Sequence, residues 1–279
     1  MSKWKPIKQT EIDSFFTGSN EIILNYRIYG KNNTKTIVFF YGFDGSIEMC
    51  QLLMDKLSEK YRVLIIDYPG HCYSPETKNK YSLDDLVTTI NELIVQLSIN
   101  RFILWGYSFG GVIALQFYKK HSNNIDFFIF HHSTSCFSRG LLKVFYFFYL
   151  IFLRIYFRIT INYLSIPLLL DKHFNKDLVK LARQISMYNS KNGIIELFKK
   201  IIFGNFDGII RSINIPVLLI GSKRDILVPL YETKKVFNLL NTKKEMEVFD
   251  DIGHLSIVSA PERVFNVIDK FLQKSDKGE

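Results

Sequence analysis

The 279-residue sequence has few cysteines and contains no dense block of basic residues. The three cysteines, Cys50, Cys72 and Cys136, are odd in number and lack CxxC spacing, which argues against a disulfide framework and against a zinc site. Reduced thiols of this kind predict a cytoplasmic protein. No apolar run with the length of a signal sequence follows the charged N-terminal residues, so the sequence predicts no secretory signal.

Charge and composition narrow the classes of protein further. Basic side chains outnumber acidic ones by 36 to 27, which gives a formal net charge of +9 and a field that favours anionic surfaces. Because no nucleic-acid module is recognisable, we expect solvated surface lysines and no nucleic-acid partner. With 47% apolar and 15% aromatic residues, the chain is expected to fold compactly around one large core that carries an insertion.

Short apolar runs alternate with stretches that have helical spacing. The expected strands are residues 20–30, 35–42, 61–70, 101–106, 125–131, 215–221 and 244–251. The expected helices are residues 46–59, 82–97, 109–120, 230–240 and 261–273. Ser82 is a candidate N-cap, and Pro261 lies in a candidate first turn. This alternation predicts an α/β fold whose mostly parallel sheet is covered by helices on both faces.

Residues 132–210 interrupt the alternation. They begin with an aromatic-rich run and continue with helix-like patterns near residues 176–188 and 193–203. We interpret this block as a helical cap inserted between two strands of the sheet. The core would then consist of residues 1–131 and 211–279.

Ser108 lies between glycines in "GYSFGG" (106–111), a G-x-S-x-G pattern with an apolar strand before it and a helical pattern after it. Glycine at positions 106 and 110 permits a sharp turn that would lift the hydroxyl of Ser108 out of the sheet. The amide of Phe109, at the start of the helix, could then donate to an oxyanion. The alternative is an ordinary strand-to-helix turn in which the serine caps the helix.

A serine nucleophile needs a base and an acid that orients the base. Asp225 follows an expected strand in "LLIGSKRDILVP", and His254 follows the next one in "VFDDIGHLSIVSAPE". Both positions fall at carboxyl ends of parallel strands, where loops converge. Three alternatives stay open: Asp225 is only a turn cap, Asp250 or Asp251 is the acid, or His254 is an ordinary loop histidine.

The remaining histidines are weaker candidates for a functional role. His121 ends an expected helix among lysines, and His173 lies in the cap. The adjacent His131 and His132 lack the spacing of metal ligands.

Five segments, in this order along the chain, resemble those of the α/β-hydrolase superfamily: "VFFYGFDGS" (38–46), "IDYPGHCYSP" (66–75), "GYSFGG", "GSKRDILVP" (221–229) and "DIGHLSIVSAPE" (251–262). The likeness covers all but the cap and the extreme N-terminus. It implies the α/β-hydrolase fold with the cap after the sixth core strand, and a serine esterase, thioesterase or lipase-like activity. It also implies a catalytic triad and an oxyanion hole without a metal or organic cofactor. The implied site residues are Ser108, Asp225 and His254, with the backbone N–H groups of Phe43 and Phe109.

Two residues depart from the superfamily pattern. Tyr41 stands where a histidine usually helps to organise the oxyanion loop, so the geometry of that loop is open. Cys72 stands where glycine is usual, and we interpret it as a packing residue because no partner base is evident near it in the sequence.

The resemblance implies that an ester or thioester with an apolar moiety is cleaved through an acyl-enzyme. Serine at the turn argues against the alkyl-enzyme chemistry of haloalkane dehalogenases and epoxide hydrolases. Two alternatives stay open. The same triad could serve an acyltransferase or a C–C bond hydrolase, or the fold could belong to a binding protein without catalytic activity.

The cap contains an apolar run, residues 141–153, that is too short and too charged to be a clean membrane span. If residues 139–158 formed one helix, Arg139, Lys143, Arg154 and Arg158 would fall within about 100° of one another as a basic stripe. One interpretation is a lid whose aromatic residues line an apolar substrate pocket. The other is a helix that lies at a lipid interface. The sequence does not indicate an oligomeric state.

Overall fold

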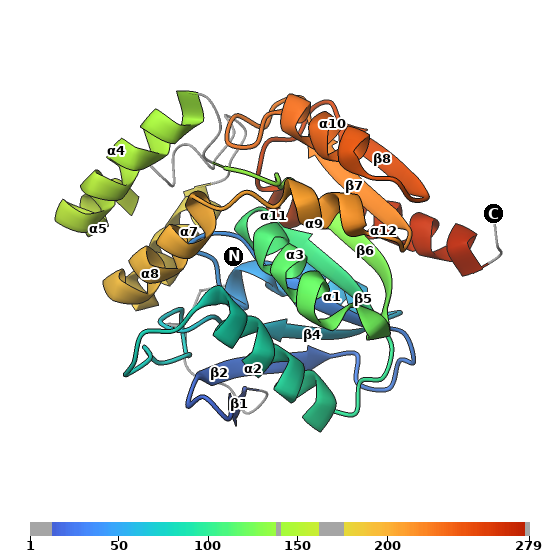
Figure 1. The fold of residues 1–279 in the computed structure, drawn as a ribbon, viewed down its shortest axis with the longest axis horizontal. Helices are drawn as coiled ribbons and strands as arrows, with labels where there is room; N and C mark the ends of the chain where they lie inside the picture. Colours follow the sequence, from blue (N-terminus) through green and yellow to red (C-terminus); the bar gives the residue numbers. More distant parts are fainter. Residues whose placement is uncertain (1–12, 138–140, 162–175, 277–279) are drawn as a thin grey trace.

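A computed structural model of the protein describes residues 13–137, 141–161 and 176–276. Its centre is an eight-stranded sheet with the order β1-β2-β4-β3-β5-β6-β7-β8 (Figure 1). The strands are β1 (Ser14–Thr17), β2 (Ile23–Tyr29), β3 (Thr36–Phe40), β4 (Arg62–Ile66), β5 (Phe102–Tyr107), β6 (Ile125–His131), β7 (Val217–Ser222) and β8 (Lys244–Phe249). The β1–β2 and β2–β4 pairs are antiparallel and the remaining pairs are parallel, which confirms the expected mostly parallel sheet.

Helices flank the sheet because its central strands are apolar along their whole length. Every residue of β3 and β5 is buried, which is typical of parallel strands covered on both faces. The core helices are α1 (Gln51–Leu57), α2 (Leu83–Gln96), α3 (Phe109–His121), α9 (Asp207–Ser212), α10 (Leu230–Leu239), α11 (Ser256–Ser259) and α12 (Pro261–Asp276). One group consists of α1 packed on α12, and another consists of α2, α3, α9 and α10 in series. Short 3-10 turns precede α1 (Glu48–Cys50) and follow α3 (Ser122–Asn124).

The expected cap of α2 is present as a capping box. Ser82 Oγ accepts a hydrogen bond from the Asp85 amide at 3.0 Å, and the Asp85 carboxylate accepts one from the Ser82 amide at 2.7 Å. These two bonds satisfy donors that the first turn of a helix otherwise leaves open. The start predicted for this helix from the sequence is therefore confirmed.

In the described part of the insertion between β6 and β7, the cap helices are α4 (Leu141–Ile155), α5 (Phe157–Ile159), α7 (Lys176–Tyr188) and α8 (Lys191–Ile202). They gather beside one end of the sheet (Figure 1). A helical insertion after the sixth strand is thus confirmed. The proposed cap limits at 132 and 210 stay predictions, and α9, which spans the second limit, packs on the core helices α3 and α10.

The condition for the four-residue basic stripe, one continuous helix over residues 139–158, is not met. α4 ends at Ile155, Tyr156 leaves the helical conformation (φ −120°, ψ 48°), and α5 begins at residue 157. Arg158 turns toward the end of α7 and donates hydrogen bonds to the carbonyl oxygens of Ser186 and Met187, the latter at 3.0 Å. Arg139 lies outside the described residues, as does His173, so Lys143 and Arg154 are what remains of the basic stripe on α4.

Among the described residues, no helix combines the length and the hydrophobicity that crossing a bilayer requires.

Candidate active site

Ser108 occupies a tight turn between β5 and α3. Its backbone is in a strained conformation (φ 52°, ψ −124°), which non-glycine residues rarely adopt. A Cβ at Gly110 would lie 2.1 Å from the Phe40 carbonyl oxygen, and one at Gly106 would lie 2.5 Å from the Cα of Gly111. The two glycines therefore allow the backbone segments to approach this closely. The Ser108 side chain makes no capping hydrogen bond to α3, so the interpretation as a simple helix cap is not supported.

The structure brings Ser108, His254 and Asp225 into one hydrogen-bonded series. Ser108 Oγ lies 2.9 Å from His254 Nε2, and His254 Nδ1 lies 2.7 Å from Asp225 Oδ2. A carboxylate can only accept, so we assign the imidazole proton to Nδ1, which leaves Nε2 free to accept the serine proton. All three side chains are buried. The geometry is that of a nucleophile, a base and an orienting acid.

Asp225 is held by its own loop. Its Oδ1 accepts hydrogen bonds from the amides of Leu227 at 2.9 Å and Val228 at 2.8 Å. Burial opposes ionisation of this carboxyl, but the charge and hydrogen bond of His254, together with His132, outweigh burial and place the pKa of Asp225 below its usual range. A carboxylate is therefore available beside the imidazole at neutral pH.

The alternative acids lie elsewhere. Asp250 forms an exposed ion pair with Lys223 at 2.9 Å, and Asp251 forms one with Arg263 at 2.8 Å. Neither side chain contacts His254, although both share its loop.

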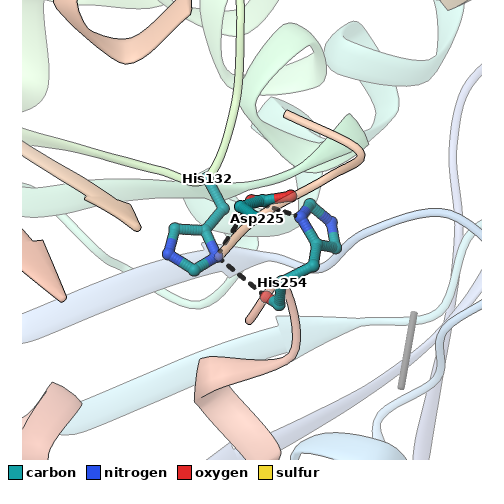
Figure 2. A group of neighbouring side chains, drawn as sticks. All are labelled: His132, Asp225 and His254. Atoms are coloured by element: carbon teal, nitrogen blue, oxygen red, sulfur yellow. Dashed lines mark hydrogen bonds and ion pairs between the residues drawn. The ribbon is translucent and has the colours of Figure 1, made fainter. Parts of the chain in front are cut away.

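His132, a weak candidate in the sequence because it lacks the spacing of a metal ligand, lies against the proposed triad. It follows β6 in a left-handed conformation (φ 45°) and is fully buried. Its Nδ1 lies 2.8 Å from the His254 carbonyl oxygen and 3.4 Å from Asp225 Oδ2 (Figure 2). Because a carbonyl oxygen can only accept a hydrogen bond, we assign a proton to His132 Nδ1, which donates the hydrogen bond. Burial lowers the pKa of His132 to about 4, against the attraction of the Asp225 charge, so the ring is neutral at physiological pH.

Two further side chains hold the loop that carries His254. The hydroxyl of Tyr107 donates a hydrogen bond to the His254 carbonyl oxygen. His131 Nε2 lies 2.8 Å from Ser256 Oγ, while its ring stacks on Trp105 with a centroid distance of 5.9 Å. In the sequence, these contacts are indicated by the position of His131 and His132 at the end of an expected strand, which places them at the same sheet edge as the proposed triad.

His132, Asp225 and His254 also form the group of metal-ligating side chains found in the described chain, with candidate ligand atoms within 4.8 Å of one another. The distances favour hydrogen bonds over a shared ion. Ligands that each lie about 2.0–2.2 Å from a zinc ion in tetrahedral geometry are further apart than the 2.7 Å between His254 Nδ1 and Asp225 Oδ2. The arrangement therefore fits the orientation of an imidazole better than the binding of a metal.

Tyr41 supplies contacts that organise the loop after β3. Its hydroxyl donates to Asp67 Oδ1 at 3.1 Å, and its carbonyl oxygen accepts from the Tyr68 hydroxyl at 2.9 Å. Asp67 Oδ1 also accepts from the Ile47 amide at 3.0 Å, beyond the loop. The loop is thus fixed at both ends without the histidine that is usual at position 41.

The amides expected to form the oxyanion hole lie beside Ser108. The rings of Phe43 and Phe109 are 5.3 Å apart, and a Cβ at Gly42 would lie 3.0 Å from that of Ser108. No acceptor for the Phe43 amide is found within the described chain, and the Phe109 amide is in the first turn of α3, where amides lack partners within the helix. Both amides are therefore available as hydrogen-bond donors.

Asn189, at the end of α7, connects the cap to this loop. Its side-chain nitrogen donates to Asp44 Oδ1 at 2.8 Å, and its side-chain oxygen accepts from the Cys72 amide at 2.8 Å. Burial raises the pKa of Asp44 to about 7, which the hydrogen bond of Asn189 and the charge of Arg158 partly oppose.

Cys72 adopts φ 45°, a conformation that suits the glycine usual at this position. Burial raises the pKa of its thiol well above the usual range, so the thiol stays protonated. This state favours the interpretation of Cys72 as a packing residue.

A cavity of about 80 Å³ opens over Ser108 and His254. Aromatic and aliphatic side chains dominate its walls, with Asp44 as the acidic exception. The cap contributes Phe145, Tyr146 and Tyr149 from α4, and Phe198 from α8. The described site is therefore a narrow apolar pocket whose roof is built by the cap.

Comparisons with known proteins agree with this architecture. A family model for the alpha/beta hydrolase fold matches residues 35–155. An esterase from Exiguobacterium antarcticum has a similar structure, with a TM-score of 0.86 at 18% identity over 93% of this chain and 99% of that chain. The chain has the α/β-hydrolase fold. A thermophilic esterase from Thermogutta terrifontis gives a TM-score of 0.84 at 19% identity, covering 94% of this chain and 98% of the esterase.

Curated sequences match only in part. Epoxide hydrolase 1 of Caenorhabditis elegans is 25% identical over 116 residues, which is 41% of this chain and 29% of the relative. Across the first curated relatives, the chain spans between 29% and 39% of their length. The family match includes Ser108 but ends before Asp225 and His254, so the case for those two residues rests on their geometry.

Proposed function

We propose that this α/β-hydrolase-fold protein is a serine hydrolase that cleaves carboxylic esters or thioesters with an apolar moiety. The observation that carries the proposal is the series Ser108–His254–Asp225, hydrogen-bonded at 2.9 and 2.7 Å, at the base of a mostly aromatic pocket. An activated hydroxyl beside two free backbone donors is suited to attack on a carbonyl carbon. The likeness to two solved esterases supports the same reaction class.

In the first step, Ser108 Oγ attacks the carbonyl carbon while His254 Nε2 takes its proton. The carbonyl π electrons move to oxygen, and the amides of Phe43 and Phe109 stabilise the oxyanion. Asp225 stabilises the imidazolium through its hydrogen bond to Nδ1. When the carbonyl re-forms, the bond to the leaving group breaks, and the imidazolium gives its proton to the departing alkoxide or thiolate.

In the second step, water takes the place of the leaving group. His254 Nε2 removes a proton from water as the water oxygen attacks the acyl carbon. The second oxyanion accepts hydrogen bonds from the same two amides, and its collapse breaks the bond to Ser108 Oγ. The imidazolium returns its proton to Ser108, which releases the carboxylic acid and restores the enzyme.

The substrate class follows from the pocket walls. Phe137, Tyr146 and Phe198 offer aromatic surface to an acyl or aromatic group. In this proposal, residues 132–210 act as the lid over the site. Product analysis with added alcohols and amines would separate hydrolysis from acyl transfer to those nucleophiles.

The proposal is tested with a fluorophosphonate probe, intact-mass detection and turnover of p-nitrophenyl acetate, butyrate and octanoate. We expect one adduct on the wild type, none on Ser108→Ala, and much slower labelling of His254→Ala. Ser212→Ala, which changes an exposed serine on α9, is the matched control and should label like the wild type. An adduct that persists in Ser108→Ala would show that another residue is the nucleophile. Absence of both labelling and turnover would favour a binding protein.

A further inference from the structure

The helix α4 has two apolar faces, of which the protein covers one. Tyr146, Tyr149 and Leu153 point into the molecule and are buried. On the opposite side lie large apolar side chains that are between 37% and 61% exposed. We call these residues the outer cap face: Val144, Phe147, Phe148, Ile151, Phe152 and Ile155.

The outer cap face is a continuous stripe. Its members are spaced i, i+3, i+4, i+7, i+8 and i+11, the positions that share one side of an α-helix. The exposed ring of Tyr156, whose centroid lies 6.5 Å from that of Phe152, extends the surface beyond α4. Contiguous apolar surface of this kind marks an interaction site in a folded protein.

Charge indicates what covers the stripe. Lys143 and Arg154 are exposed and eleven residues apart, so they lie about 20° from each other around the helix, at one border of the stripe. The sequence contains no Asp or Glu between Asp126 and Asp171. The apolar stripe is thus bordered by positive charge on α4, and Arg154 also lines a groove with Glu76 and Glu196 of neighbouring segments.

We propose that the outer cap face docks on the surface of an anionic phospholipid membrane, with α4 lying along the interface. The stripe carries no hydrogen-bonding side chain, whereas an interface with another protein normally contains many polar pairs. Aromatic and aliphatic side chains beside basic ones are typical of helices that lie among lipid headgroups. At 15 residues, α4 is about 22 Å long, which suits a helix in the plane of the interface.

The position of α4 connects this surface to the pocket. Phe145, Tyr146 and Tyr149 of the same helix line the cavity above Ser108. A docked α4 would therefore have lipid on one face and the substrate pocket on the other. If the proposed hydrolase function holds, the substrate class is an ester that dissolves in the membrane.

The test measures flotation of the whole protein with vesicles of phosphatidylcholine alone, or of phosphatidylcholine and phosphatidylglycerol in equal parts. The wild type is expected to bind the anionic vesicles more tightly, and less tightly as salt is added. Phe148→Ser combined with Phe152→Ser is expected to weaken binding by about tenfold or more. Lys143→Gln combined with Arg154→Gln should weaken binding to the anionic vesicles only.

Leu52→Ser and Val95→Ser are the matched controls, because these side chains are 59% and 66% exposed on core helices and should not affect flotation. Thermal unfolding checks that each variant is folded. Docking is tested separately from catalysis, because Ser108→Ala should still bind vesicles and the Phe148 and Phe152 variant should still cleave soluble esters. Equal flotation of that variant and the wild type, or no flotation at all, would overturn the proposal. A dimer in ultracentrifugation that the same variant disrupts would instead assign the face to a second copy of the chain.

Discussion

Non-glycine residues with positive φ are concentrated on the loops that build the proposed site: Asp44, Cys72, Ser108 and His132. Only Glu21 and Ser98 share this property elsewhere in the described chain. Such conformations cost free energy and persist where the surrounding structure holds them. Here they orient the proposed nucleophile, the proposed oxyanion loop and a donor to the loop of His254. Strain at single residues is thus part of how the site is arranged.

Asp225→Asn is expected to lower kcat/KM for a p-nitrophenyl ester by about 10⁴-fold, because an amide no longer fixes the proton on His254 Nδ1 or stabilises the imidazolium. Steady-state kinetics measures the effect. Asp251→Asn removes an exposed carboxylate from the His254 loop and should leave kcat/KM unchanged within about twofold. If Asp251→Asn lowered kcat/KM strongly and Asp225→Asn left it unchanged, Asp251 rather than Asp225 would be the acid.

His132 is expected to act as a positioning residue through its donor to the His254 carbonyl oxygen. His132→Ala should lower kcat by about tenfold with little change in KM, because a less well-held imidazole affects the reaction more than binding. His132→Asn should recover much of the rate, since asparagine keeps a donor and tolerates a left-handed backbone. An alanine variant with wild-type kcat would assign His132 to packing alone.

At the scale of elements, the sequence predicted well those strands and helices whose pattern is local. Each expected strand exists, and α7 covers residues 176–188 as expected. β1 was missed because a four-residue edge strand, "SFFT", is too short to show a period. The break at Tyr156 was also missed, because no proline or glycine marks it. It coincides with the contact of Arg158 with the end of α7, which is distant in sequence.

The same distinction applies to the site. The turn at Ser108 could be predicted because its glycines and flanking strand and helix are adjacent in sequence. Asp225 and His254 could be placed because both follow strands whose ends share one edge of the sheet. His132 could not be assigned a role in this way, since its contact with His254 arises from the packing of three strand ends and not from spacing.

Gly110→Ala tests the close approach of α3 to β3. The added Cβ would lie 2.1 Å from the Phe40 carbonyl oxygen, so backbone must move, and we expect a loss of about 3 kcal/mol in the free energy of unfolding. Urea denaturation measures this loss. Gly208→Ala in α9 is the control, because nothing lies within 4 Å of its new Cβ, and it should be neutral or stabilise by about 0.5–1 kcal/mol. Equal effects of the two changes would contradict the steric argument.

At the scale of the whole molecule, the proposed site lies where the described cap helices meet the core. Asn189 joins α7 to the loops at Asp44 and Cys72, and the Ser190 amide donates to the Gly70 carbonyl oxygen at 2.8 Å. The hydrogen bond between Asn189 and Asp44 is buried, so its strength depends on whether the Asp44 carboxyl group is ionised. The cap is therefore attached to the core, close to Ser108, by a hydrogen bond that depends on the charge of Asp44.

Asp44 makes this attachment depend on pH. Its pKa is raised to about 7 in the folded protein, from a usual value near 3.8, so the folded state binds a proton that the unfolded state releases between these limits. The contribution of Asp44 to stability is therefore fully present below about pH 4, falls as pH rises, and levels off above about pH 7. Asp44→Asn mimics the protonated carboxyl. Its advantage over the wild type should grow between pH 5 and pH 8 in urea denaturation, as the wild-type carboxyl ionises. Asp250→Asn controls for the loss of a carboxylate at the surface. If the free energies of unfolding of the wild type and of Asp44→Asn changed in parallel with pH, the raised pKa of Asp44 would be contradicted.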